Sequence, residues 1–96
     1  MLRAIDFADR DGEIVGSALA LAAAARAALE SGPAGPRLDF AGFQGGSSSY
    51  FTVVIRRLLE HPDGPAFVRD DSRFTFGSPF QRSIFERSRE AVLSGN

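Results

Sequence analysis

The chain lacks cysteine, lysine and tryptophan, and it has a single histidine. The absence of cysteine excludes disulfide bonds, thiolate catalysis and cysteine-ligated metal sites. The absence of lysine excludes a phosphate-binding loop of the G-K-[ST] kind, in which a lysine contacts the β- and γ-phosphates. Asp70 and Asp71 are adjacent acidic residues, but we interpret them as a solvated turn. We therefore expect no metal and no cofactor.

Charge and long apolar runs are also scarce. Eleven basic and twelve acidic residues give a formal net charge of -1, and no basic block stands out. This does not favour nucleic-acid binding, which needs an electropositive face. The longest apolar stretch, 18–29, is interrupted by Arg26 and falls short of the ~20 residues that span a bilayer. It also follows the acidic sequence DFADRDGE, unlike a signal peptide. We expect a cytoplasmic protein that does not bind membranes.

The composition that remains is that of a folded protein. Hydrophobic residues make up 44% of the 96 residues and charged residues 24%, which is typical of globular domains. Residues 1–96 are enough for one domain with one modest core. Nine phenylalanines predict that this core is rich in phenyl rings.

The first half of the chain predicts alternating strands and helices. Residues 2–9 alternate apolar and polar side chains and predict a strand. Residues 12–32 have helical spacing, strong helix formers and a Gly-Pro stop, and predict a long helix. A short strand is predicted at 37–40. From Phe51 the spacing is helical and places Phe51, Val54, Ile55 and Leu58 on one face. The predicted helix ends at the sequence HPDGP.

The second half predicts two further strands and a third helix. Residues 66–69 and 73–76 are interpreted as short strands joined by a turn. Ser78, Pro79 and Gln81 then form the pattern of a capping box, which begins a helix. Its predicted inner face carries the following apolar side chains: Phe80, Ile84, Phe85, Ala91 and Val92. The predicted fold is α/β, a small mixed sheet with about three helices mainly on one face, in the order β-α-β-α-β(β)-α.

A cluster of small residues, Gly45 and Gly46 followed by Ser47, Ser48 and Ser49, precedes the second helix. One serine can cap this helix, and the glycines ease the turn into it. A catalytic serine would need G-x-S-x-G and a base. Here Tyr50 replaces the second glycine. His61, which we expect to be exposed at the far end of the helix, lies ~18 Å away along it. We expect no catalytic residues and interpret the remaining hydroxyls as a recognition or phosphorylation surface.

The stretch LDFAGF, residues 38–43, together with the serine cluster resembles STAS domains. Their pattern is L-D-L-S-G-V, three further residues and D-S-S-G, and they occur in anti-sigma-factor antagonists and sulfate transporters. The chain is still more similar to STAS-like bacterial domains in which an aromatic residue follows three serines. The resemblance extends over residues 12–59. It places Ser48 at the serine that a partner kinase phosphorylates, with Ser47 replacing the aspartate and Tyr50 the glycine.

The resemblance implies a non-enzymatic regulatory module. Its partner-binding loop would be Gly45 to Tyr50 together with the exposed face of the second helix, and its partner a protein such as a GHKL-type ATPase kinase of the histidine-kinase class. Two alternatives remain open. The same helix start is a candidate phosphate, nucleotide or small-ligand site. A homodimer that buries Phe43, Tyr50 and the third helix is the other.

Overall fold

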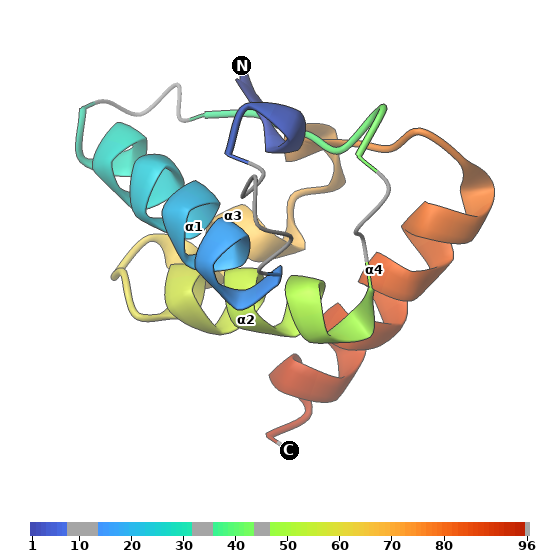
Figure 1. The fold of residues 1–96 in the computed structure, drawn as a ribbon. Helices are drawn as coiled ribbons and strands as arrows, with labels where there is room; N and C mark the ends of the chain where they lie inside the picture. The colour runs from blue at the N-terminus through green and yellow to red at the C-terminus, as the bar shows by residue number, and fades with distance from the viewer. Residues whose placement is uncertain (8–13, 32–35, 44–46, 96) are drawn as a thin grey trace.

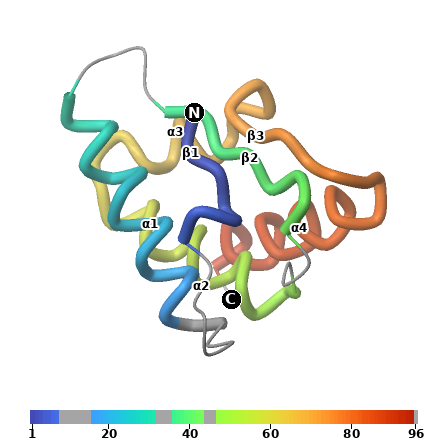
Figure 2. Tube along the Cα trace, turned by 45° about the horizontal axis from the view of Figure 1, so that its top comes forward, coloured from blue at the N-terminus to red at the C-terminus, as the bar shows by residue number. Residues whose placement is uncertain are grey.

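The computed structural model describes residues 1–7, 14–31, 36–43 and 47–95. Its described part contains three short parallel strands and four α-helices, so the predicted α/β class is confirmed. The strands lie side by side in the order β1, β2, β3 (Figure 2). Helices α1, α2 and α4 lie on one side of this small sheet (Figure 1).

The sheet consists of β1 (Leu2–Arg3), β2 (Leu38–Asp39) and β3 (Phe74–Thr75). Leu2 pairs with Leu38, and Leu38 pairs with Phe74, all in parallel. The expected mixed sheet is therefore wrong for the described residues. Each connection between neighbouring strands contains a helix, which returns the chain to the same end of the sheet, as a parallel pair requires.

Strand β1 is much shorter than the strand predicted for residues 2–9. After Arg3 the chain turns into the 3₁₀ helix η1 (Ala4–Phe7). Ala4 is fully buried there, and 42% of Ile5 is exposed. The alternation of apolar and polar residues in this stretch therefore falls on a helical turn and does not mark the two faces of a strand.

Two of the predicted helices form the centre of the structure. Helix α1 (Ile14–Glu30) packs on α2 (Ser48–Leu59). The predicted inner face of α2 is confirmed, because Phe51, Val54, Ile55 and Leu58 are all fully buried. Small alanine side chains on the buried face of α1 let the two helices approach closely.

The strand predicted at 66–69 is wrong: this segment is helix α3 (Gly64–Arg69). Pro65 stands at the start of the helix, where its missing N–H and fixed φ cost nothing. Phe67 and Val68 point into the core. The 3₁₀ helix η2 (Asp71–Arg73) then leads into β3, so no hairpin forms here and only the second predicted strand is present.

Helix α4 (Pro79–Leu93) begins where the sequence predicts, with the Ser78 hydroxyl accepting a hydrogen bond from the Gln81 N–H. Its buried face passes through Gln81, Phe85 and Ser88. The inward orientation predicted for Phe80 and Ala91 is wrong, because both are exposed, Phe80 to 75%. Since Gln81 is polar, sequence periodicity alone placed the apolar face one residue away from the observed one.

The core is rich in phenyl rings, as predicted. Phe51 packs edge-on against Phe40 and Phe85, with ring centroids 5.1 and 5.4 Å apart. Phe74 from the sheet lies 4.6 Å from Phe85. This aromatic cluster joins the sheet to α2 and α4, and so it holds the start of α2 in place.

Candidate functional site

The start of α2 is the region that the sequence singles out. Ser47 is the N-cap: its hydroxyl accepts from the Tyr50 N–H at 3.2 Å, and its carbonyl oxygen accepts from the Phe51 N–H at 3.1 Å. An N-cap hydrogen bond of this kind contributes about 1 kcal/mol to helix stability. The prediction that one serine of the cluster caps the helix is confirmed.

Ser48 and Ser49 are the first two residues of α2, and both are exposed. Their backbone N–H groups belong to the first turn of the helix, where N–H groups have no carbonyl acceptor within the helix. The structure therefore leaves two hydroxyls at the positive end of the helix dipole, accessible from outside. Gly45 and Gly46, the other predicted members of the loop, lie outside the described residues.

Tyr50 differs from its serine neighbours, because it is fully buried. Its ring lies 4.6 Å from that of Phe43 and 5.6 Å from that of Phe51. The side chain of Tyr50 is therefore not part of the exposed loop surface where the sequence placed it. The sequence held the signal for this: Tyr50 and Val54 are four residues apart and so share one helical face.

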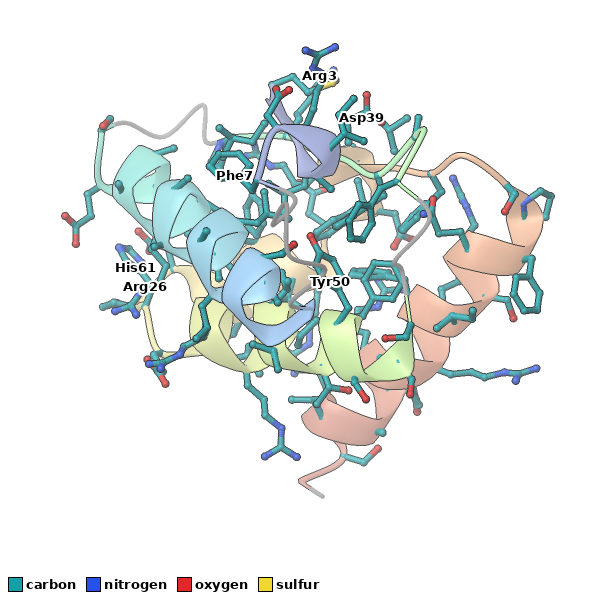
Figure 3. All side chains as sticks on the ribbon, viewed as in Figure 1. Arg3, Phe7, Arg26, Asp39, Tyr50 and His61 are labelled. Carbon is teal, nitrogen blue, oxygen red and sulfur yellow. The ribbon has the colours of Figure 1, made fainter. Side chains whose placement is uncertain are left out.

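The hydroxyl of Tyr50 is an unusual feature of this core. It lies between α1 and α2 (Figure 3), and neither it nor the buried Ser17 hydroxyl has a hydrogen-bond partner among the described residues. Burial raises the pKa of Tyr50 to about 12, and the nearby Ser17 hydroxyl offsets part of that rise.

A tight turn leads from β2 toward the serines. The Asp39 carboxylate accepts from the Ala41 N–H at 2.9 Å, and the Phe43 N–H donates to the Phe40 carbonyl at 3.1 Å. Gly42 has a φ of 78°, a conformation that favours glycine. This turn explains why the residue at position 42 is a glycine.

Gln81 joins this turn to α4. Its Nε2 donates to the carbonyl oxygens of Phe40 and Phe43, at 3.2 and 3.0 Å, and its Oε1 accepts from the Gly77 N–H at 2.8 Å. The capping-box pattern predicted a bond to the Ser78 N–H, so the reciprocal contact is shifted by one residue. Sequence reasoning missed the contacts to the turn, because nothing local indicates a bond across about forty residues.

His61 lies past the end of α2, far from Ser48, so it cannot act as a base for the serines. The predicted exposure of His61 is wrong, since only 8% of the residue is accessible. Its Nδ1 accepts from the Asp63 N–H at 3.0 Å, and its Nε2 lies 3.8 Å from the Glu30 carboxylate at the end of α1. The imidazole therefore packs the ends of two helices together.

Asp70 and Asp71 have local structural roles. Asp70 accepts hydrogen bonds from the side chain and the backbone N–H of Ser72, which lower its pKa, with Arg73 adding to this. Asp71 pairs with Arg89 at 2.6 Å. Within the described ranges, no group of three residues could hold a metal ion.

A groove runs between the outer sides of α1 and α2. It is lined by Leu19, Ala23 and Arg26 of α1 and by Arg57 of α2, and its volume is about 230 Å³. Both guanidinium groups contact the same oxygen, Oε1 of Glu60, at 3.2 and 3.4 Å. Figure 3 shows Arg26 near His61, toward the carboxyl-terminal ends of α1 and α2.

Comparison with known proteins does not identify a relative: no family model, curated protein or solved structure matches the chain. Among the residues that the structure describes, no helix has both the length and the apolar character needed to cross a bilayer.

Proposed function

We propose that the chain is a non-enzymatic regulatory module of STAS-like type, which binds a protein partner through the start and outer face of α2. The observation that carries the proposal is the contrast within the serine cluster. Ser47 is used by the cap, whereas Ser48 and Ser49 are exposed on a helix that the core anchors firmly. Exposed polar groups on a rigid element are typical of recognition surfaces.

We further propose that phosphorylation of Ser48 switches the binding. A phosphate there would add nearly two negative charges beside the positive end of the α2 dipole. The helix tolerates this charge, but a docking surface that fits a neutral serine would not. Following the resemblance to anti-sigma-factor antagonists, the proposed partner is an ATPase of the histidine-kinase type that phosphorylates Ser48.

The position of His61 supports a non-enzymatic role for the serines. This single imidazole lies past the end of the twelve-residue helix that Ser48 begins. A helix of that length separates them by roughly 18 Å at 1.5 Å per residue. A general base must lie within hydrogen-bond reach of the proton it removes, directly or through one water.

The test is recovery of the partner from cells that express the tagged full chain, with Ser48→Asp, Ser48→Ala and Ser31→Asp as variants. Ser31 is exposed at the end of α1 and controls for added charge. We expect wild type, Ser48→Ala and Ser31→Asp to recover the ATPase, and Ser48→Asp to lose it. The recovered ATPase should transfer phosphate from ATP to wild type and not to Ser48→Ala. Full recovery by Ser48→Asp contradicts the switch.

A second candidate function uses the N–H groups at the start of α2 to bind a small phosphate-bearing ligand. Ser48 and Ser49 place two such groups at the surface. Ligand binding raises the midpoint of thermal unfolding in a concentration-dependent manner. A rise with inorganic phosphate or a nucleotide would favour this function, and an unchanged midpoint across a nucleotide panel excludes it.

A further inference from the structure

We propose that the groove between α1 and α2 docks an acidic amphipathic helix of the partner, with Arg26 and Arg57 binding one of its carboxylates. This inference rests on the proposed function, because it specifies the chemistry of the partner that the outer face of α2 would bind. It assigns a role to a groove that lies away from the serine cluster.

The shape of the groove suits a rod-like ligand. Leu19, Ala23 and Arg26 are spaced by four and three residues, so they form one line along α1. Arg57 forms the opposite side from α2. The groove is therefore apolar at one end and cationic at the other. An amphipathic helix with an apolar and an acidic residue one turn apart matches this arrangement.

The charge of the groove favours an acidic ligand. Two arginines share one oxygen of Glu60, so one negative charge faces two positive ones. Each contact uses only Nη1, although a guanidinium has five N–H donors. A carboxylate from the partner can therefore form further charge-assisted hydrogen bonds while Glu60 stays in place.

This positive charge is local to the helix pair. Helices α1 and α2 with the α2 C-cap Glu60 contain three arginines and two glutamates, a local charge of +1, whereas the whole chain has a formal charge of -1. Such an asymmetry steers oppositely charged partners toward one face. A nucleic-acid ligand fits less well, because the described residues that line the groove include no aromatic ring on which a base could stack.

The alanines of α1 favour a helix as the bound segment. Ala23 lines the groove, the exposed Ala20 and Ala27 share its helical face at spacings of three and four residues, and all three side chains end at Cβ. The distance between packed helix axes depends on the size of the side chains at the contact. A partner helix can therefore approach α1 closely enough to reach both arginines.

The experiment uses a synthetic amphipathic helical peptide with leucines on one face and two glutamates one turn apart. A peptide with glutamine in place of glutamate and a sequence-scrambled peptide are its controls. Binding to the full chain is measured by fluorescence anisotropy, and the contact is mapped by NMR chemical-shift changes. We expect shifts at Leu19, Ala23, Arg26 and Arg57, and affinity about tenfold weaker for the glutamine peptide.

Variants of the chain test the two arginines directly. The double variant Arg26→Gln with Arg57→Gln should bind the glutamate peptide about tenfold more weakly than wild type. The matched control is Arg69→Gln with Arg87→Gln, which removes the same charge from exposed positions on α3 and α4. We expect the control to bind like wild type. Circular dichroism verifies that both double variants keep their helical content.

Three results would overturn the proposal. The first is equal loss of binding in both double variants, which indicates a non-specific charge effect. The second is a set of shifts that maps outside the groove, or no shifts at all. The third is preferential binding of single-stranded DNA over the glutamate peptide, when this DNA binding is lost only in the double variant Arg26→Gln with Arg57→Gln.

The experiments also separate this inference from the proposed function. If Ser48→Asp loses the ATPase while the double variant Arg26→Gln with Arg57→Gln still binds it, the docking groove is refuted and the phosphorylation switch stands. Peptide binding that depends on Arg26 and Arg57, combined with full recovery of the ATPase by Ser48→Asp, would refute the switch and leave the groove standing.

Discussion

The Gln81 side chain donates a hydrogen bond to the carbonyl oxygen of Phe43 at 3.0 Å, although 38 residues separate the two in sequence. Because Gln81 also binds Phe40 and Gly77, one buried amide holds the turn after β2 against the start of α4. This turn, which ends at Phe43, precedes the serine cluster in the sequence. The position of the candidate site thus depends on a residue far from it in the chain.

Replacing Gln81 should destabilise the fold. In Gln81→Ala, the Phe43 carbonyl and the Gly77 N–H lose the Gln81 hydrogen bond, and the Phe40 carbonyl keeps only its bond from the Phe43 N–H. We expect the free energy of unfolding to fall by about 2 kcal/mol. Gln81→Glu keeps the acceptor but loses the donor, and it should also be destabilised. Urea denaturation measures both, with Arg87→Ala as an exposed control. A Gln81→Ala variant as stable as the control would contradict this role.

Tyr50→Phe should leave stability unchanged or raise it slightly. The variant removes a buried hydroxyl that has no partner among the described residues, while it keeps the ring contacts with Phe43 and Phe51. Tyr50→Ala removes the ring itself and should cost about 3–5 kcal/mol. Thermal and chemical unfolding distinguish the two. A loss above ~1 kcal/mol in Tyr50→Phe would show that the hydroxyl has a bonded partner, such as a buried water.

The raised pKa of Tyr50 predicts a loss of stability in alkali. The value in the folded state, about 12, lies above the ordinary 10.0, so the unfolded chain releases this proton more readily. The contribution of Tyr50 is complete below pH 10 and is lost as the pH rises toward 12. Tyr50→Phe should remove this component. Because the chain has one tyrosine and no tryptophan, tyrosinate absorbance reports this residue alone.

Ser47 and Ser48 should differ in their effect on stability. Ser47→Ala removes the N-cap of α2 and should cost about 1 kcal/mol, whereas Ser48→Ala should change stability by less than ~0.5 kcal/mol. Ser48→Asp should stabilise the helix by a few tenths of a kcal/mol, because it adds negative charge to the first turn. Chemical denaturation measures all three. Equal losses for both alanine variants would mean that the cap is shared.

Gly64 is predicted to be intolerant of any side chain. A Cβ at this position would lie 1.8 Å from the carbonyl oxygen of Leu58, a backbone atom that cannot move aside. We expect Gly64→Ala to destabilise the fold by more than about 3 kcal/mol. Ala66→Gly, on the exposed side of α3, is the comparison and should cost about 1 kcal/mol. Similar stability of the two variants would contradict the close approach of α3 to α2.

Helical periodicity predicted the long elements because it extends over several turns. Helices α1 and α2 and the start of α4 follow from repeating apolar positions, from a cap within the serine cluster and from the cap at Ser78. Helix α3 escaped prediction, because six residues are too few to distinguish a helical from an alternating pattern. Two-residue strands are set by their neighbours in the sheet, which sequence periodicity does not report.

The candidate site was predicted in part. Local chemistry indicated that one of the three serines caps α2 and that the start of this helix is exposed, but it did not indicate which serine is the cap. The contacts of Gln81 and His61 are made to distant backbone or to another helix, and polar side chains at such positions are ordinarily expected at the surface. The groove between α1 and α2 depends on how two helices pack, and so it had no signal in the sequence.

The shortness of the strands has a consequence for how the molecule opens. A sheet with two residues per strand has few backbone hydrogen bonds to protect, whereas α2 has five fully buried side chains and packs against α1, α3 and α4. Amides in the middle of α2 should therefore exchange with solvent last, through global unfolding, and those of the sheet earlier. Ser48 and Ser49 thus begin the most persistent element of the fold, so a modification there changes the surface without loosening its support.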